Sequence, residues 1–257
     1  MFLIMDRYLE EVITGTTGIN VHYYREGIMR RRVKRRMSFN KIDSQKEYAE
    51  FLKENDEEIE ELLKTLTIGV TEFFRYRPYY DNLEEILKER FSGEKIKIWS
   101  AGCSTGEEPY SLAILLDKIG FEYEILATDI DKSKLDFARK GVYSPDKVDM
   151  LDNEIISKYF EPKESFFKIK EDYKKKIEFM QHDIISDGII GSFDVISCRN
   201  TVKFFTKKIT ETVFINFHMS LNKNGVLGLG IAESLPKKLE GNLFRSLKKK
   251  DALFEKI

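Results

Sequence analysis

The sequence predicts a chain in two parts, a helical N-terminal domain followed by an α/β domain with a mostly parallel sheet. Residues 1–66 show helical spacing of apolar residues with few strand signals. From about residue 95, short apolar runs alternate with helical segments, as expected for right-handed βαβ units. With 257 residues, 42% of them hydrophobic, the chain is long enough for one large domain and a small companion.

Four helices are expected in the N-terminal part, at Tyr8–Ile13, Tyr23–Met37, Gln45–Lys53 and Glu57–Leu66. In the second helix, Met29, Val33 and Met37 recur every four residues and define one apolar face. Basic residues lie elsewhere on this helix: Arg31, Lys34 and Arg35 on the opposite face, with Arg30 and Arg32 on the flanks. Such a run is usually a solvated face. Here only Glu26 opposes it in a chain of net charge −1, so it is also a candidate surface for an acidic partner.

The α/β part is predicted from four apolar runs, at Ile96–Ser100, Glu124–Thr128, Phe193–Cys198 and Gly225–Leu229. Helices are expected between and after them, at Pro109–Leu116, Ser133–Lys140 and Thr206–Leu221. Leu243–Leu247 and Ala252–Lys256 flank a polar stretch and predict a terminal hairpin. The lysine-rich segment Tyr159–Phe179 is expected to form a small β-rich insertion. The expected domains are therefore 1–70 and 71–257, with the insertion at about 155–180.

Composition and cysteine spacing disfavour several classes of protein. The near-neutral charge argues against a surface built wholly for nucleic acid. The two cysteines, Cys103 and Cys198, lack the spacing of a zinc site or a disulfide scaffold. No apolar run approaches the length of a membrane span, and the N-terminus lacks the pattern of a secretory signal. We therefore expect a cytoplasmic protein without a metal site or membrane insertion.

The loop after the first apolar run, Trp99–Pro109, suits a cationic ligand. Gly102 lets the backbone approach a ligand closely. The loop matches neither GxGxxG nor a P-loop, and the acidic pair Glu107 and Glu108 disfavours phosphate. These carboxylates suit the sulfonium and ammonium groups of S-adenosylmethionine, although both glutamates could simply complement a helix N-terminus.

Two further loops follow predicted strands, where ligands bind in open α/β sheets. Asp129 ends the second run and is placed to accept hydrogen bonds from ribose hydroxyls, whereas Asp131 is expected to cap the next helix. After the third run come Arg199 and Asn200; the arginine either contributes to the site or holds the loop. Asp183, in the Phe179–Ile184 stretch, is expected to supply an edge to an adenine pocket.

At these residues the sequence resembles the CheR-type chemotaxis receptor methyltransferases, which are protein-glutamate O-methyltransferases. The segments that carry the resemblance are IWSAGCSTGEEPYSLA (98–113), ATDIDKSKLDFARKGVY (127–143), FDVISCRN (193–200), LNKNGVLGLGIAES (221–234), VTEFFR (70–75) and GINVHYYREGIMRRRVKRRM (18–37). The resemblance implies a class I S-adenosylmethionine-dependent methyltransferase with a Rossmann-like parallel sheet. It also implies a helical N-terminal domain and a small β-subdomain insertion.

The resemblance further implies roles for individual residues. The implied cofactor residues are Thr71 and Arg75 at the methionine part, Gly102 in the first loop, Glu108 at the amino group, Asp129 at the ribose, Asp183 with Ile184 at the adenine, and Arg199 with Asn200 completing the pocket. Arg75 is also expected to orient the incoming carboxylate, unless it contacts only the cofactor. The implied substrate is the cytoplasmic helical region of chemoreceptors, and the implied product of the cofactor is S-adenosylhomocysteine. The residues expected to bind this substrate are Arg30, Arg31, Lys34 and Arg35.

Gly69, Phe204 and Ile231 are among the positions that depart from the family's pattern, as is Ala232 in place of a serine. Gly69 replaces an asparagine, Phe204 replaces an aromatic hydroxyl, and Ile231 replaces a histidine. They leave open a domain that binds the cofactor without turnover. Another alternative is an RNA methyltransferase whose arginine-rich helix grips phosphates, but the chain shows no recognised RNA module. We expect a monomer that acts without nucleic acid. Because the insertion lacks the glycine loop of members that dock on a receptor tether, we also expect tether-independent action.

Overall fold

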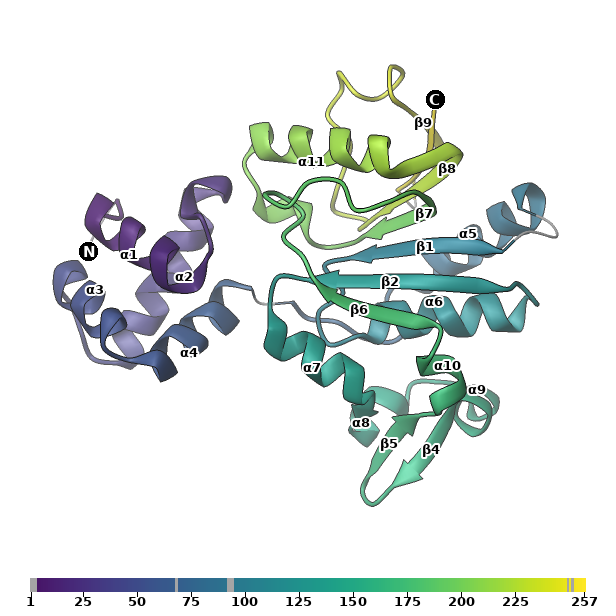
Figure 1. Cartoon of the computed structure of the whole chain (residues 1–257), viewed down its shortest axis with the longest axis horizontal. Helices are drawn as coiled ribbons and strands as arrows, with labels where there is room; N and C mark the ends of the chain where they lie inside the picture. Colours follow the sequence, from purple (N-terminus) through teal and green to yellow (C-terminus); the bar gives the residue numbers. More distant parts are fainter. Residues whose placement is uncertain (1–3, 68, 92–94, 249, 251) are drawn as a thin grey trace. The chain divides into compact units, whose positions relative to one another are not determined.

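The computed structural model describes residues 4–67, 69–91, 95–248, 250 and 252–257. The chain divides into two compact units (Figure 1). The first comprises Met1–Gly69 together with Phe204–Thr210, and the second comprises Val70–Lys203 together with Glu211–Ile257. A short segment from the C-terminal half of the chain is therefore part of the first unit. Among the residues with described positions, no helix has the length and apolar character needed to cross a membrane.

The first unit is built from helices. They are α1 (Arg7–Thr17), η1 (Val21–Tyr23), α2 (Glu26–Phe39), α3 (Gln45–Lys53) and α4 (Asp56–Leu66). Asp6, Ser44 and Asn55 precede α1, α3 and α4, and each side chain accepts a hydrogen bond from a backbone N–H of the first turn. The four predicted helices are confirmed, except that α2 starts three residues later than expected. The reason is that Val21–Tyr23 form a separate 3-10 turn.

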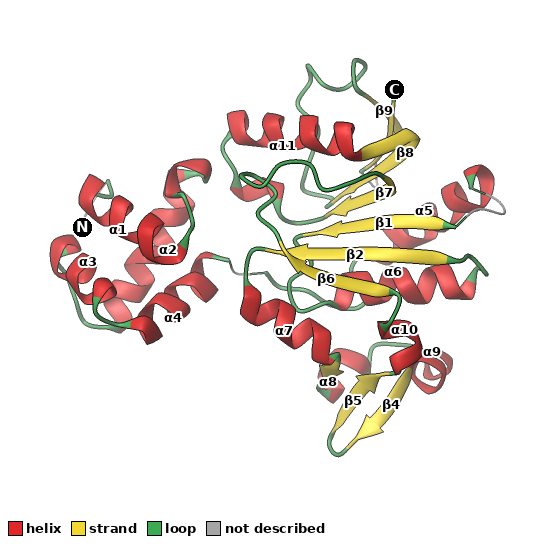
Figure 2. Ribbon diagram, viewed as in Figure 1, coloured by secondary structure: helices red, strands yellow, loops and turns green. Residues whose placement is uncertain are grey.

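The second unit carries a seven-stranded sheet in the order β6-β2-β1-β7-β8-β10-β9 (Figure 2). Its strands are β1 (Ile96–Ala101), β2 (Tyr123–Asp129), β6 (Ile177–Gln181), β7 (Phe193–Cys198), β8 (Leu221–Leu229), β9 (Phe244–Lys248) and β10 (Leu253–Lys256). The strands from β6 to β8 in this order pair in parallel, whereas β10 is antiparallel to both β8 and β9. The predicted parallel sheet and the terminal hairpin are therefore confirmed.

Helices cover both faces of this sheet. They are α5 (Arg77–Arg90), α6 (Glu107–Lys118), α7 (Lys132–Lys140) and α11 (Lys207–Ser220). Because successive side chains of a strand point to opposite faces, Ile98 joins the buried cluster formed with α5, α6 and α7. The neighbouring Trp99 instead packs on Phe217 of α11, with ring centroids 5.2 Å apart. Sequence analysis missed α5, although the buried Tyr79, Leu83 and Ile86 have helical spacing.

A small antiparallel sheet has the order β3-β5-β4. It consists of β3 (Val142–Tyr143), β4 (Phe160–Lys163) and β5 (Phe166–Ile169), with the short helices α8 (Pro145–Val148), α9 (Asn153–Tyr159) and α10 (Glu171–Lys174) around it. The predicted β-rich insertion exists, but its C-terminal limit was wrong, because Ile177 begins β6 of the main sheet. At this sheet edge Ile177 is buried and the next residue, Glu178, is exposed. The alternation hides the strand from a search for continuous apolar runs.

Candidate active site

The candidate site lies at the carboxyl ends of the parallel strands, where the strand order changes direction. From β1 the chain continues to β2 and β6 on one side, and it then returns to β7 and β8 on the other side. Such a change in an open α/β sheet creates a crevice outside the strand ends. Gly102 follows β1, Asp129 ends β2, Asp183 follows β6 and Arg199 follows β7. The fold thus brings all the predicted loops to one edge of the sheet.

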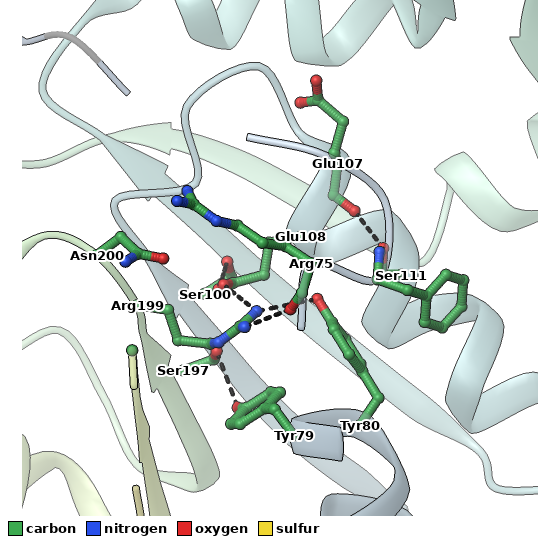
Figure 3. A network of polar contacts seen from close by, with 12 residues as sticks. Arg75, Tyr79, Tyr80, Ser100, Glu107, Glu108, Ser111, Ser197, Arg199 and Asn200 are labelled. Carbon is green, nitrogen blue, oxygen red and sulfur yellow. Dashed lines mark hydrogen bonds and ion pairs between the residues drawn. The ribbon is translucent and has the colours of Figure 1, made fainter. Parts of the chain in front are cut away.

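A buried network centred on Arg199 occupies this edge (Figure 3). The guanidinium donates a hydrogen bond to the backbone oxygen of Arg75, and Nη1 lies 3.3 Å from the Tyr80 hydroxyl and 3.5 Å from Oε2 of Glu108. Its Cζ also lies 4.2 Å from the centroid of the Tyr79 ring. Arg199 is only 8% exposed. These contacts support the interpretation in which the arginine holds neighbouring segments in place.

Glu108 joins this network from the first turn of α6. Its Oε1 accepts a hydrogen bond from Oγ of Ser100 at 2.9 Å, and its Oε2 faces Arg199. Burial raises the pKa of Glu108, while the positive charge of Arg199 and the serine hydrogen bond oppose this rise. The carboxylate is therefore fixed in direction and can attract a positively charged group at the helix N-terminus.

The adjacent Glu107 has a different environment. It is 1% exposed, and its Oε1 lies 3.3 Å from Nζ of Lys147. Its Oε2 accepts a hydrogen bond from the hydroxyl of Thr105 at 2.6 Å. Figure 3 shows its side chain pointing away from the Arg199 network. Of these two neighbouring glutamates, Glu108 joins the Arg199 network, whereas Glu107 pairs with Lys147 and Thr105.

The loop after β1 approaches the loop after β7 so closely that a glycine is required. Gly102 has φ +80°, and a Cβ at this position would lie 2.6 Å from Oγ1 of Thr201. The backbone N–H groups of Gly102 and Cys103 both donate to the carbonyl of Thr128, each at 2.8 Å. A side chain at residue 102 would therefore clash with the Thr201 side chain, which would have to move. Cys103 is 1% exposed, and burial raises the pKa of its thiol well above its usual range, which disfavours the reactive thiolate.

Asp129 is held by backbone donors on both sides. Its Oδ2 accepts from the N–H of Ser104 at 2.8 Å and its Oδ1 from the N–H of Asp131 at 3.0 Å. Burial raises the pKa of Asp129, whereas the charge of Lys134 and the two backbone bonds oppose the rise. A carboxylate has about four acceptor positions, so one remains on each oxygen for a ligand hydroxyl. Asp131 caps α7 as predicted, with Oδ1 accepting from the N–H of Ser133 at 3.0 Å.

The loop after β6 lies beside Asp129. The N–H of His182 donates to the carbonyl of Asp129 at 3.1 Å, which fixes the start of the loop. Asp183 is engaged locally, because its Oδ1 accepts from the N–H of Ile185 and its Oδ2 from the hydroxyl of Ser186. Ile184 is 7% exposed. The polar atoms of Asp183 thus shape the loop, and Ile184 contributes apolar surface next to it.

Glu233 organises the loop that contains Asn200, a role that sequence analysis missed. Its Oε2 accepts from the N–H groups of Asn200 and Gly230, each at 2.8 Å, and its Oε1 accepts from the N–H of Lys203 at 3.0 Å. Burial raises the pKa of Glu233, and these backbone bonds oppose the rise. Asn200 has φ +62°, a conformation that such anchoring stabilises. An acid three residues after the glycine that follows β8 is the signal that could have predicted this contact.

The 70–75 segment carries the two remaining predicted cofactor residues, Thr71 and Arg75. Both are half-buried. The carbonyl of Thr71 accepts a hydrogen bond from Nζ of Lys147 at 2.6 Å, and the guanidinium of Arg75 donates to the carbonyl of Val70. In Figure 3 the backbone oxygen of Arg75 faces Arg199, whereas the guanidinium of Arg75 extends away from this contact.

The predicted substrate residues lie on α2 of the first unit. Arg31, Lys34 and Arg35 are exposed, and Arg30 is half-buried. The apolar face is confirmed, because Met29, Val33 and Met37 are buried. Arg32 differs from its neighbours: it is 9% exposed, donates to the carbonyl of Leu66 and lies over the Phe204 ring at 4.8 Å. Arg32 and Phe204 therefore belong to the packing of this unit.

Comparison with known proteins now identifies the family. The model of the CheR methyltransferase SAM-binding domain matches residues 69–252, and the model of the CheR methyltransferase all-alpha domain matches residues 7–67. The chain belongs to the CheR methyltransferase family. Curated relatives named chemotaxis protein methyltransferase include those of Listeria innocua (34% identical, 89% of each chain covered), Borreliella burgdorferi (30%, 88% of this chain and 87% of the relative) and Salmonella typhimurium (29%, 89% and 83%).

Membership of the CheR family establishes the reaction class and the cofactor. The chain is a methyltransferase with the class I fold, and its methyl donor is S-adenosylmethionine. The residues at the carboxyl edge of the sheet fit this donor. Glu108 offers a fixed carboxylate for an ammonium group, and Asp129 keeps acceptor positions for hydroxyls.

Proposed function

We propose that this CheR family member transfers the methyl group of S-adenosylmethionine to glutamate side chains in the cytoplasmic helical region of chemoreceptors. The observation that carries the proposal is the basic surface of α2, formed by the exposed residues Arg31, Lys34 and Arg35. Chemoreceptor helices that display glutamates would be attracted to this surface and placed in register on it. The names of the curated relatives support a role in chemotaxis.

The same proposal assigns donor binding to nine residues at the carboxyl edge of the sheet: Thr71, Arg75, Gly102, Glu108, Asp129, Asp183, Ile184, Arg199 and Asn200. In it, Glu108 holds the amino group of the donor and Asp129 its ribose. Arg199 contributes by holding the Glu108 carboxylate and the backbone of the 70–75 segment in position. Asp183 and Ile184 border the adenine, of which the buried isoleucine contributes apolar contact.

The chemistry needs no general base. The donor supplies an electrophilic methyl group on a sulfonium, and a glutamate carboxylate is already ionised at neutral pH. With the donor held by Glu108 and Asp129, a carboxylate oxygen would form the new C–O bond with its own electron pair as the C–S bond broke, so no proton would move and S-adenosylhomocysteine would leave. The protein contributes position and exclusion of water from the nucleophile. We assign the orientation of the incoming carboxylate to the guanidinium of Arg75.

The proposal is tested by incubating the protein with methyl-labelled donor and a receptor cytoplasmic fragment. The expected product is a base-labile ester, so mild alkali releases the label as methanol. Label that resists alkali and appears on added RNA would contradict the assignment. Binding of the donor without transfer to any receptor fragment would favour a cofactor-binding domain without turnover.

Charge reversal separates the receptor-binding surface from the donor site. Arg31→Glu/Arg35→Glu is expected to lower kcat/KM for the receptor fragment by about tenfold or more, since surface charges govern steering and register. Its matched control, Arg7→Glu/Lys46→Glu, reverses two exposed charges of the same unit outside α2. Both variants should bind the donor as the wild type does. Equal loss of transfer in both variants would contradict a specific role for α2.

A further inference from the structure

The ammonium group of Lys147 connects two segments of the donor site. Its Nζ donates to the Thr71 carbonyl at 2.6 Å and lies 3.3 Å from Oε1 of Glu107. Glu107 is 1% exposed, so its charge depends on this pair for compensation. One partner comes from the 70–75 segment and the other is the first residue of α6. A single cation thus holds together two pieces of chain that are 36 residues apart, counted from Thr71 to Glu107.

Within the 70–75 segment the Arg75 guanidinium donates to the carbonyl of Val70, and the other contacts described for the segment lie beyond Thr71. The ring of Phe73 packs edge-on against Tyr143 with centroids 4.9 Å apart, and the N–H of Phe74 donates to a serine hydroxyl of α6 at 2.9 Å. The carbonyl of Arg75 accepts a hydrogen bond from the buried guanidinium of Arg199. The middle and the end of the segment are therefore fixed to the rest of the unit by these groups, and Lys147 ties the Thr71 backbone to α6.

Lys147 is itself placed by the small sheet. It lies on α8, between β3 and β4 in the chain, and the next residue, Val148, is fully buried. Tyr143 of β3 donates its hydroxyl hydrogen to the carbonyl of Thr105 at 2.8 Å, which holds this region against the loop after β1. The Lys147 side chain keeps 37% of its surface exposed. Solvent screens this pair on the lysine side only, so loss of Lys147 would leave the buried Glu107 carboxylate without its counter-ion and disturb the local geometry.

We propose that Lys147 is a positioning residue for donor binding. It holds the backbone of Thr71 against the start of α6 and thereby keeps the methionine end of the site closed, without touching the donor itself. The proposal rests on the assignment of the donor site given above. The small antiparallel sheet would then influence donor affinity, because it places Lys147.

Isothermal titration with S-adenosylhomocysteine tests the proposal in the full-length protein. Lys147→Met is expected to raise Kd about tenfold, since a charge-assisted hydrogen bond and the partner of a buried carboxylate are lost together. The matched control is Lys174→Met. The Nζ of Lys174 also contacts a backbone carbonyl, at 3.3 Å, and a carboxylate, at 3.1 Å, but neither partner belongs to the donor site. This control should change Kd less than about twofold. Lys147→Arg, which keeps the charge, should recover most of the affinity.

Coupling to Thr71 distinguishes positioning from general destabilisation. Thr71→Ala should weaken binding in the wild type but have a smaller effect in the Lys147→Met background, because the segment has already moved. Fully additive effects, or wild-type affinity in Lys147→Met, would overturn the proposal. Should Lys147→Met not fold, Lys147→Gln removes the same ammonium group with a shorter polar side chain, and unchanged affinity there would overturn the proposal equally. Failure of the wild type to bind at all would instead contradict the donor-site assignment.

Discussion

Replacing Arg199 by methionine is expected to destabilise the second unit by about 3–5 kcal/mol. The substitution keeps much of the side-chain length but removes a guanidinium that is 8% exposed. Glu108, whose Oε2 lies 3.5 Å away, would then be a nearly buried carboxylate without a counter-ion. Leaving one partner of a buried pair uncompensated typically costs about 3–5 kcal/mol. The substitution also removes the cation–π contact between Arg199 Cζ and the Tyr79 ring centroid, 4.2 Å apart. Such a contact is worth up to about 2 kcal/mol, which does not simply add to the loss from the uncompensated carboxylate.

Urea unfolding monitored by fluorescence measures this loss. The chain has one tryptophan, Trp99, which is buried in the second unit and therefore reports on it. Arg139→Met is the matched control. Arg139 also donates to a backbone carbonyl and to a carboxylate, each at 2.7 Å, but it is 43% exposed. Because exposed pairs contribute about 0–1 kcal/mol, this control should stay close to the wild type.

A second substitution tests the assigned cause. If the uncompensated charge of Glu108 dominates the loss, Arg199→Met/Glu108→Gln should be more stable than Arg199→Met alone by more than about 1 kcal/mol. A loss below about 1 kcal/mol in Arg199→Met, or no recovery in the double variant, would refute the reasoning. The first result would mean that the network is not stabilising, and the second that packing rather than charge governs it.

Three further predictions concern the loops of the site. Burial raises the pKa of Glu108, so donor affinity should fall as the pH falls through that raised value, because the protonated acid no longer attracts the donor's ammonium group. Glu108→Gln should bind the donor about tenfold more weakly at pH 7.5. In titrations at decreasing pH its donor affinity should not show this fall. Gly102→Ala should weaken donor binding and lower Tm by several degrees, because its Cβ would lie 2.6 Å from Oγ1 of Thr201, and a Tm equal to that of the wild type would contradict this. Glu233→Gln loses one of its two acceptor oxygens, so we expect about 1–3 kcal/mol of destabilisation in urea and faster hydrogen exchange at Asn200; unchanged exchange would exclude the proposed anchoring.

Much of the fold could be predicted because its signals are local. Apolar spacing located the helices of the first unit, and apolar runs located β1, β2, β7 and the C-terminal hairpin. Where the signal was weak, the prediction was incomplete. β6 alternates Ile177 with the exposed Glu178 and was merged with the insertion. The start of β8 was placed at Gly225, although the strand begins at Leu221, because polar residues such as Asn222 interrupt the pattern.

The sequence by itself determined the loops that carry polar residues at the strand ends, since the residues after each apolar run are read directly. It could not determine which atoms those side chains meet. Glu107 and Glu108 are neighbours of the same type, yet one pairs with Lys147 and the other with Arg199. Arg199 meets Tyr80 across 119 residues of chain. Such contacts depend on how distant segments pack, and burial then sets the strength of each charge interaction. Only the tertiary structure decides them.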